Sequence, residues 1–384
     1  MHDRGQFERS EQLLRLVTIS CLGSATDTRA ARYFKDLDCP APTDDVLDLV
    51  AARLGVRADG RRHDIGRARD RSRQVCAAAT AARLTALTVQ DAEYPELLRQ
   101  IVDPPVVLWV KGDPAALIVP AVAIVGARAA TPAGLSIAKR LGHDLASAGL
   151  IVVSGLARGA DGAAHTGALD AGGRTVGVLG CGADVVYPPE HAELAQRVAA
   201  NGAIASELWP GAPPLPPHFP LRNRIISGLV RAVVVVEASD KSGSLITARS
   251  ALDQGRDVLA VPGSVASGRY RGSHALIKDG ARLVETVEDV LDELKWPQSG
   301  AQQGAGAVPW RDTSSDNSLQ ESELEKAMAP GEPYTVDDLA GQSGRSAAAL
   351  LAELGALELS GRVSRIAGGA FVRLDEPVRT RRTE

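Results

Sequence analysis

Short apolar runs alternate with amphipathic stretches through the middle of the chain, from about residue 121 to residue 294. Val122–Val125, Ile151–Val153 and Ala232–Glu237 are examples of these runs, and they are rich in valine and isoleucine. Runs of this length and composition are typical of parallel strands that are buried on both faces. Because the stretches between them are long enough for crossover helices, the pattern predicts an α/β fold built on a doubly wound parallel sheet.

The patterns on either side of this region predict further domains. Residues 1–90 carry apolar spacings that suit short amphipathic helices, and we expect a helical, SAM-like domain there. The main domain is predicted at 91–296, followed by a linker rich in Gly, Gln, Ser and Asp at 297–318. Residues 319–374 contain three helical patterns and a short hairpin, the order of a winged helix, and residues 375–384 form a tail.

Two segments outside the predicted sheet could contact nucleic acid. The third helix of the winged unit, Ser346–Leu359, has no Arg, Lys, Asn or Gln to read base edges, so a protein-interaction role is favoured for this unit. Seven arginines lie from Arg57 to Arg73, and for them a solvated helix face is favoured over a basic stripe that binds nucleic acid.

Glycine and basic or hydroxyl side chains follow the ends of several predicted strands. Gly126 and Arg128 follow one strand, Arg158 and Gly159 follow another, and Lys241–Ser244 follows a third. In an open α/β sheet, ligands bind at the carboxyl ends of the strands. Glycine-containing turns that open a helix expose backbone N–H groups and favour anions. Phosphate binding at one edge of the sheet is the simplest explanation that these loops share.

A proline-rich segment interrupts the alternation of strands and helices. Glu207–Pro220 contains six prolines, and we expect an extended, rigid loop. Its stiffness would hold Arg222 and Arg224 at a fixed place on the edge of the sheet. For the rings of Trp209 and Phe219, packing onto the core is favoured over stacking on bases.

Composition restricts the class of protein. No apolar run approaches the ~18 residues that span a membrane, and the amino terminus lacks the apolar stretch of a signal peptide. The four cysteines show neither CxxC nor metal-ligand spacing, so we expect a reduced, cytoplasmic protein without a metal site. The formal net charge of −4 argues against a generally basic nucleic-acid-binding protein, although a local basic groove can supply the attraction.

Motifs of catalysis are scarce. There is no GxxxxGK[ST] motif, and the first predicted βα turn does not carry GxGxxG. His165 lies four residues after Asp161, and a hydrogen-bonded structural histidine is favoured over acid–base chemistry or metal binding. Glu237 and Asp240 are carboxylates near a strand end, but a single carboxylate does not make a mechanism. We therefore expect a binding protein with no catalytic residue and no cofactor.

Five motifs in a fixed order resemble a known family. They are Val125–Arg128, Ser154–His165, His218–Leu229, Glu237-Ala238 with Lys241–Ala248, and Val261–Gly263. Over roughly Tyr94–Leu294 the chain is similar to the bacterial DNA processing protein A family (DprA, also called Smf). The resemblance implies an extended Rossmann-like domain that binds single-stranded DNA through its phosphates. It also implies a homodimer that protects incoming DNA and loads the RecA recombinase in competence, natural transformation and homologous recombination.

The resemblance further implies which residues contact phosphates. Transferred by motif position, they are Gly126, Arg128, Arg158, Gly159, Arg222, Asn223, Arg224, Lys241, Ser242, Gly243 and Ser244. The chain departs from the family pattern at Ala160, where isoleucine is usual, and at His274, where asparagine is frequent. The contact made by His274 is therefore left open. The amino-terminal helices match the family only loosely.

An enzyme of another class is the alternative. The cytokinin-activating phosphoribohydrolases are related Rossmann-like proteins that bind a nucleotide at the same edge and carry a Pro-Gly-Gly-x-Gly-Thr-x-x-Glu motif. This chain has Asp240–Ser244 at that place, with Ala248 and Arg249 where the catalytic glutamate is expected. Binding of single-stranded DNA is therefore favoured over a nucleotide-binding, phosphoribohydrolase-like activity.

Overall fold

The computed structural model describes residues 2–22, 29–37, 42–266, 268–297, 322–329, 331–359, 362–366 and 369–374. The chain divides into two compact units, residues 1–129 with 138–296 and residues 130–137 with 297–384. Of the predicted linker at 297–318 only Pro297 is described, and the predicted tail at 375–384 lies outside the described residues. Across these described ranges, no helix combines the length and the apolar character needed to cross a membrane.

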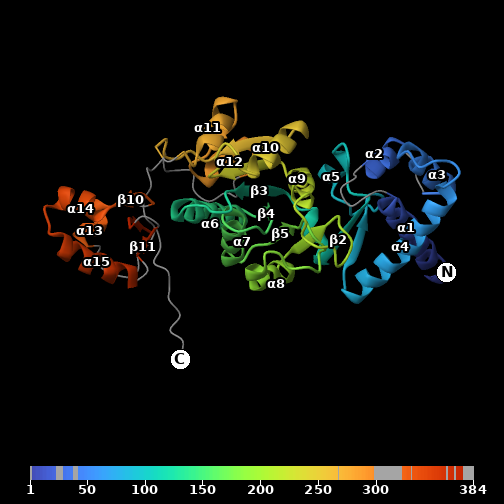
Figure 1. Ribbon diagram of the computed structural model, residues 1–384, viewed down its shortest axis with the longest axis horizontal. Helices are drawn as coiled ribbons and strands as arrows, with labels where there is room; N and C mark the ends of the chain where they lie inside the picture. The colour runs from blue at the N-terminus through green and yellow to red at the C-terminus, as the bar shows by residue number, and fades with distance from the viewer. Residues whose placement is uncertain are drawn as a thin grey trace. The chain divides into compact units, whose positions relative to one another are not determined.

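The amino-terminal part of the first unit, as far as it is described, is made of four helices (Figure 1). They are α1 (His2–Cys21), α2 (Arg29–Asp36), α3 (Asp44–Arg53) and α4 (Arg61–Ala81). Apolar side chains at helical spacing, among them Leu16 of α1 and Leu47 of α3, are buried in one cluster. The same cluster includes Trp109 of the central sheet, so these helices pack directly against the main domain.

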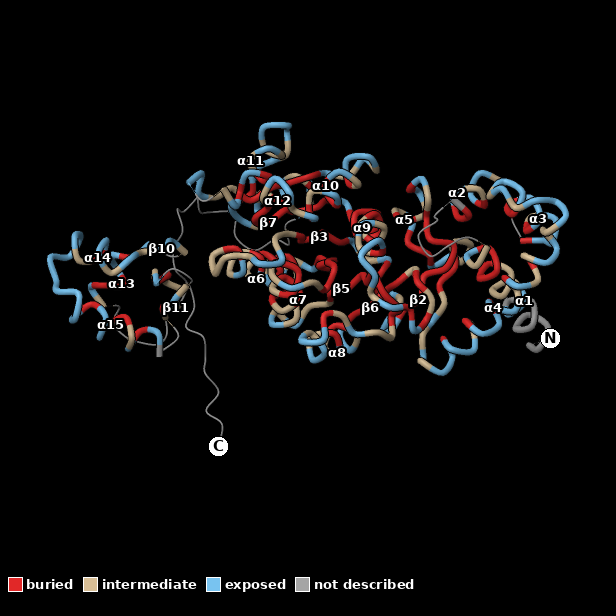
Figure 2. The backbone as a smooth tube through the Cα atoms, in the orientation of Figure 1, coloured by how far each residue is buried: buried red, intermediate tan, exposed pale blue. Residues whose placement is uncertain are grey.

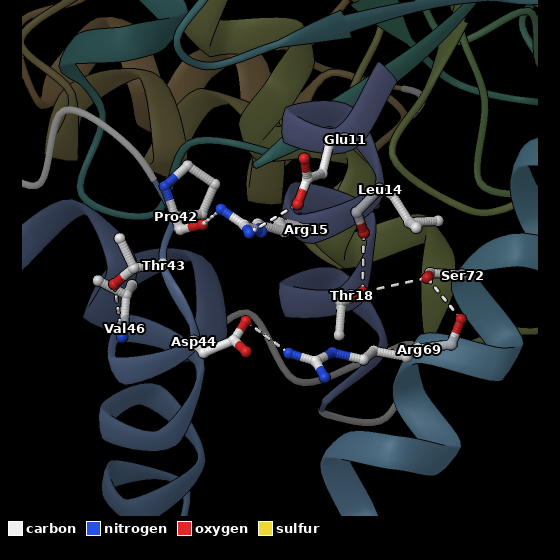
Figure 3. A network of polar contacts seen from close by, with 10 residues as sticks. All are labelled: Glu11, Leu14, Arg15, Thr18, Pro42, Thr43, Asp44, Val46, Arg69 and Ser72. Carbon is white, nitrogen blue, oxygen red and sulfur yellow. Dashed lines mark hydrogen bonds and ion pairs between the residues drawn. The ribbon is translucent and has the colours of Figure 1, made fainter. Parts of the chain in front are cut away.

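Hydroxyl side chains help to fix the positions of these helices (Figure 3). The Thr18 hydroxyl of α1 donates to the Leu14 carbonyl at 2.7 Å and lies 3.0 Å from the Ser72 hydroxyl of α4. Thr43 is the N-cap of α3 and accepts a hydrogen bond from the Val46 N–H group. The buried hydroxyl pair joins α1 to α4 without leaving a polar group unsatisfied.

The arginine-rich segment lies mainly on α4 and pairs with aspartates. The ion pairs are Arg61 with Asp48 at 2.9 Å, Arg69 with Asp44 at 2.5 Å, and Arg73 with Asp70 at 2.9 Å. Arg71 lies over the ring of Trp209. The interpretation of this segment as a solvated helix face agrees with these contacts.

A nine-stranded sheet forms the centre of the first unit. Its strands are β1 (Thr85–Thr88), β2 (Val107–Gly112), β3 (Ala121–Gly126), β4 (Ile151–Ser154), β5 (Thr175–Val178), β6 (Ala203–Ser206), β7 (Ala232–Val236), β8 (Asp257–Ala260) and β9 (Arg282–Leu283). Their spatial order is β1-β2-β6-β5-β4-β3-β7-β8-β9, with β3 to β9 parallel and β1 and β2 added in antiparallel fashion. The strand order reverses between β3 and β7, so the predicted doubly wound α/β fold is confirmed.

Helices and short turns connect the strands (Figure 1). They are α5 (Glu96–Gln100), η1 (Pro114–Leu117), α6 (Pro132–Ser147), α7 (Ala160–Asp170), η2 (Pro189–His191), α8 (Ala192–Ala200), α9 (His218–Gly228), α10 (Ser244–Asp253), α11 (Arg271–Lys278) and α12 (Val287–Glu293). Alternate residues of β2 face different layers: Leu108 shares a buried cluster with α9, whereas Trp109 shares one with α1 to α4. Buried residues are concentrated along the strands (Figure 2).

The proline-rich segment is extended only over its first part. α9 begins at His218, inside the segment that was expected to be extended up to Pro220, and Pro217 is its N-cap. Proline is tolerated in the first turn because the first N–H groups of a helix have no partner within the helix. The expectation is therefore wrong at its carboxyl end, and Arg222 and Arg224 lie in the middle of a helix.

The described residues between 322 and 374 contain three helices and a small sheet. They are α13 (Glu323–Ala327), α14 (Val336–Ser343) and α15 (Ala347–Leu359), with strands β10 (Pro333–Tyr334), β11 (Val363–Arg365) and β12 (Phe371–Arg373) in the order β10-β12-β11. Ser322 with Glu325 and Thr335 with Asp338 form capping boxes at the starts of α13 and α14. The predicted three helices and hairpin are present, and β10 adds a third strand.

Candidate nucleic-acid interface

A pocket opens at the carboxyl ends of β3, β4 and β5. The space between its residues is about 400 Å³, a volume that includes open solvent. The residues around it are Arg128, Gly155, Ala157, Arg158, Leu179, Gly180, Cys181, Tyr187, Pro188, Phe219 and Arg222. Three of the predicted phosphate-binding arginines therefore come together from three elements: the loop after β3, the loop after β4, and α9.

Arg222 is the buried member of this trio and is only 6% exposed. Its Nη1 atom donates a hydrogen bond of 2.6 Å to the carbonyl oxygen of Val178, at the end of β5. Gly155 makes room for it, because a Cβ atom at that position would lie 1.9 Å from Nη1. Burial lowers the pKa of Arg222 to about 10, and the charge of Asp161 opposes this shift. The guanidinium therefore stays charged at neutral pH.

Asp161 shapes the loop between β4 and α7. Its Oδ2 atom accepts hydrogen bonds from the N–H groups of Gly155 at 3.0 Å and Ala157 at 3.4 Å. Leu156 lies between them with a φ angle of +54°, a left-handed conformation that leucine rarely adopts. Burial raises the pKa of Asp161, whereas Arg222 and these N–H groups lower it. Sequence reasoning connected Asp161 only with a histidine and missed this role, although the glycine-rich turn before it was visible.

Two of the three predicted glycines, Gly126 and Gly159, lie where neighbouring segments of the chain approach each other closely. At Gly126 a Cβ atom would lie 1.9 Å from the carbonyl oxygen of Val236, in the neighbouring strand β7. Gly159 has a φ angle of +76°, and a Cβ atom there would lie 2.1 Å from the carbonyl oxygen of Ala127. A larger residue at Gly126 would push β3 away from β7, and a larger residue at Gly159 would separate the loops after β3 and β4. The geometry thus gives both glycines a packing function.

An aromatic pair contributes to the wall of the pocket. The ring centroids of Tyr187 and Phe219 are 5.4 Å apart, and the guanidinium carbon of Arg128 lies 5.4 Å from the Phe219 centroid. The expectation that Phe219 packs onto the core is met in part, because its half-buried ring contacts Tyr187, which packs against the core, but also lines the pocket. For Trp209 the same expectation is confirmed: it packs against the cluster of amino-terminal helices, with Arg71 4.4 Å from the centre of its ring.

His165 is completely buried behind this region. Its Nδ1 atom lies 2.7 Å from the Oγ1 atom of Thr175. Burial lowers the pKa of His165 to about 3, so the ring is neutral. The interpretation as a hydrogen-bonded structural histidine is confirmed. Within the described part of the chain, no three His, Cys, Asp or Glu side chains are grouped so that they could hold a metal ion.

Arg224 does not line the pocket. It is only 8% exposed and pairs with Asp103 at 3.3 Å and with Glu207 at 2.5 Å. Its charge is therefore neutralised inside the fold, which corrects its assignment to the exposed edge. Asn223, between the two arginines on α9, is half-buried.

The loop between β7 and α10 forms a second group at the same edge of the sheet. Lys241 and Gly243 are exposed, Gly243 is the N-cap of α10, and the Ser242 and Ser244 hydroxyl oxygens lie 2.7 Å apart. Because β7 runs parallel to β3, this loop and the loop of Arg128 leave the sheet at the same edge. The loop is separate from the pocket, whose residues come from β3, β4, β5 and α9.

A link that sequence reasoning missed joins the loops after β3, β7 and β8. Glu237 is 1% exposed, has a φ angle of +52°, and its Oε1 atom lies 3.6 Å from Nη1 of Arg269. The same nitrogen donates to the carbonyl oxygen of Ala129 at 3.3 Å.

The contact made by His274, which the sequence left open, is defined by the structure, because its Nε2 atom lies 3.1 Å from the carbonyl oxygen of Gly263. His274 therefore makes a contact within the fold.

Comparison with known proteins places this chain among DNA-processing proteins. The sequence profile described as DNA recombination-mediator protein A matches residues 85–295, and the profile of the DprA winged helix domain matches residues 311–369. DNA processing protein DprA of Streptococcus pneumoniae is 44% identical over 214 residues, covering 56% of this chain and 76% of that protein. Protein Smf of Escherichia coli is 38% identical over 300 residues, covering 76% of this chain and 77% of that protein.

Two solved structures are similar in fold. The X-ray structure of DprA from Streptococcus pneumoniae has a TM-score of 0.63 at 36% identity, and the match covers 72% of this chain and 95% of that one. The structure that describes the single-stranded DNA binding mode of DNA processing protein A from Helicobacter pylori has a TM-score of 0.50 at 29% identity, covering 56% of this chain and 97% of that one. The chain belongs to the DNA recombination-mediator protein A family.

Proposed function

We propose that this protein binds single-stranded DNA through its phosphates at the carboxyl edge of the sheet. The observation that carries the proposal is the convergence of Arg128, Arg158 and Arg222 on one pocket beside the ring of Phe219. Arginine forks suit phosphate oxygens, and an aromatic ring suits an unstacked base. The similarity to the Helicobacter pylori protein, whose structure concerns single-stranded DNA, supports this choice of ligand.

We propose a binding protein and not an enzyme. Among the described residues that line the pocket, the titratable groups are three arginines, a tyrosine and a cysteine, with no carboxylate or histidine. Burial raises the pKa of Cys181 to about 11, so its thiol is protonated at neutral pH and is a poor nucleophile. A phosphoribohydrolase-like reaction needs a group that transfers a proton or attacks a sugar, and this lining supplies neither.

The wider role that we propose follows the family. The protein would protect incoming single strands and load RecA onto them in natural transformation and homologous recombination, acting as a cytoplasmic homodimer. Membership of a family described as recombination mediators supports this role. RecA filament formation on strands coated with single-strand-binding protein tests the loading step, and sedimentation of the purified chain tests the dimer.

A titration tests the binding itself. Labelled single-stranded and duplex oligonucleotides of equal length are titrated by fluorescence anisotropy at several salt concentrations. We expect a preference for the single strand, little dependence on base sequence, and a log–log salt slope of about −2 to −3, since each neutralised phosphate contributes about −0.7. A flat salt response or a preference for duplex would contradict the proposal.

A further inference from the structure

Arg158 is paired at the mouth of the pocket. Its Nε atom donates a hydrogen bond to the Oε1 atom of Glu190, and the two charges form an ion pair. The side chain of Arg158 is 61% exposed and that of Glu190 is 46% exposed. Both groups are therefore accessible to a ligand from solvent. When a phosphate approaches Arg158, part of the Arg158 guanidinium is already hydrogen-bonded to a carboxylate.

The backbone keeps these two side chains together. Two prolines precede Glu190, and their rings fix the φ angle of the chain that presents it. The next residue, His191, has its Nδ1 atom 3.0 Å from the carbonyl oxygen of Leu156, which lies in the same loop as Arg158. Gly162 packs against the His191 ring, where a Cβ atom would lie 2.8 Å from Cε1. Arg158 can therefore leave Glu190 by rotation of its own side chain, without movement of either loop.

Glu190 differs in exposure and in its hydrogen bonds from Asp161, a second carboxylate near the pocket. Asp161 is 7% exposed and accepts two backbone N–H groups, so it is engaged inside the fold. The hydrogen bond from Arg158 lowers the pKa of Glu190, so this exposed carboxylate is ionised at neutral pH. Glu190 thus presents a negative charge where the DNA backbone is expected to pass.

We propose that Glu190 is an intramolecular competitor of DNA phosphate for Arg158. This inference rests on the proposed binding of single-stranded DNA at the pocket. Carboxylate and phosphate oxygens accept hydrogen bonds from the same guanidinium fork. The binding free energy that DNA gains from Arg158 is therefore reduced by the free energy needed to separate the ion pair. The competition weakens binding, reduces its salt dependence and favours release of the strand.

The expected effect is modest and measurable. Exposed ion pairs are weak, so removal of the competitor should tighten binding by about 2- to 5-fold. If Arg158 then neutralises one further phosphate, the log–log salt slope should become more negative by about 0.7.

The experiment uses the full chain, a fluorescein-labelled oligothymidylate and a series of salt concentrations. Glu190→Gln is compared with Glu193→Gln, an equal change of charge at an exposed position in the first turn of α8. We expect Glu190→Gln to bind more tightly and with a steeper salt slope, and Glu193→Gln to resemble the wild type. Equal behaviour of the two variants would overturn the inference while leaving the proposed function intact, whereas a wild type without single-strand binding would refute the proposed function itself.

A double-mutant cycle with Arg158→Ala tests whether Glu190 acts through its partner. We expect Glu190→Gln to have no effect on affinity in the Arg158→Ala background. If it tightened binding there by the same factor as in the wild type, Glu190 would act by general repulsion of DNA and the competitor model would be wrong.

Discussion

Arg222 of α9 donates a hydrogen bond of 2.6 Å to the carbonyl oxygen of Val178, the last residue of β5. This bond holds a buried cation at the carboxyl end of a strand that is distant in sequence. An arginine that is already held in place loses little side-chain freedom when it binds an anion. Arg128 and Arg158 are exposed beside it, so the pocket combines one fixed and two adaptable cations.

Gly155→Ala should disturb this arrangement directly. The new methyl group would lie 1.9 Å from Nη1 of Arg222, and the buried guanidinium has to move. We expect a loss of stability of about 1–3 kcal/mol, as for overpacking, together with weaker binding of single-stranded DNA. Urea unfolding and anisotropy titration measure the two effects. Gly66→Ala is the matched control, because nothing lies within 4 Å of the added methyl group, and it should keep full stability and binding.

Arg128→Ala should weaken DNA binding by about 1–3 kcal/mol, the loss expected for a charge-assisted contact. The salt slope should become less negative by about 0.7, because one phosphate contact is lost. The melting temperature should hardly change, since Arg128 is exposed. The control is Arg231→Ala, an exposed arginine that precedes β7 and so lies at the opposite, amino edge of the sheet. Equal losses in both variants would indicate nonspecific attraction and not a site.

Arg224→Ala should lower the stability of the protein without weakening its binding of single-stranded DNA. Its removal leaves Asp103 and Glu207 without their partner, and breaking an ion pair of this burial should cost about 2–4 kcal/mol. Chemical unfolding of the purified variant measures this loss. At a temperature where the variant is fully folded, its affinity for the single strand should equal that of the wild type. If the variant kept normal stability but lost DNA binding, Arg224 would instead be a phosphate-binding residue.

His165 should make the protein sensitive to acid. Its pKa in the folded state is about 3, below the value of about 6.5 in an unfolded chain, so the unfolded state takes up the proton first as the pH falls. Above pH ~6.5 the neutral histidine makes its full contribution to the free energy of unfolding. Below that pH the contribution falls by about 1.4 kcal/mol per pH unit. Between pH 7 and pH 5 the wild type should therefore lose about 2 kcal/mol more than His165→Gln. Urea unfolding at the two pH values compares them, and equal losses would contradict the assignment.

A chain that ends at Pro297 should fold and retain most of its affinity for single-stranded DNA. All residues of the pocket and of the Lys241–Ser244 loop precede this point. The indole N–H group of Trp296 donates to the Ala148 carbonyl at 3.2 Å, so the truncation has to keep Trp296. Circular dichroism and anisotropy titration test the fragment. If residues 319–384 alone bound DNA as tightly as the whole chain, the site would lie in the second unit.

The strands and the edge of the sheet that carries the candidate site were predictable from local sequence. Val122–Val125 and Ala232–Val236 are apolar throughout, and a run of that kind has few stable arrangements other than a strand buried on both faces. Once the strands are parallel, their carboxyl ends meet at one edge, so Arg128 and Lys241 were expected there before any side chain was placed. The glycine-rich turns marked the same edge.

The separation of Arg222 from Arg224 was decided only by tertiary structure. In an extended segment, residues two apart project to the same side, whereas on an α-helix at about 100° per residue they project to nearly opposite sides. Because α9 starts at His218, Arg222 reaches the end of β5 while Arg224 turns to Asp103 and Glu207. The pairing of Arg158 with Glu190 depends in the same way on two loops that only the folded sheet brings together. Sequence determined which charges are available, and packing decided which of them the protein neutralises and which remain for a ligand.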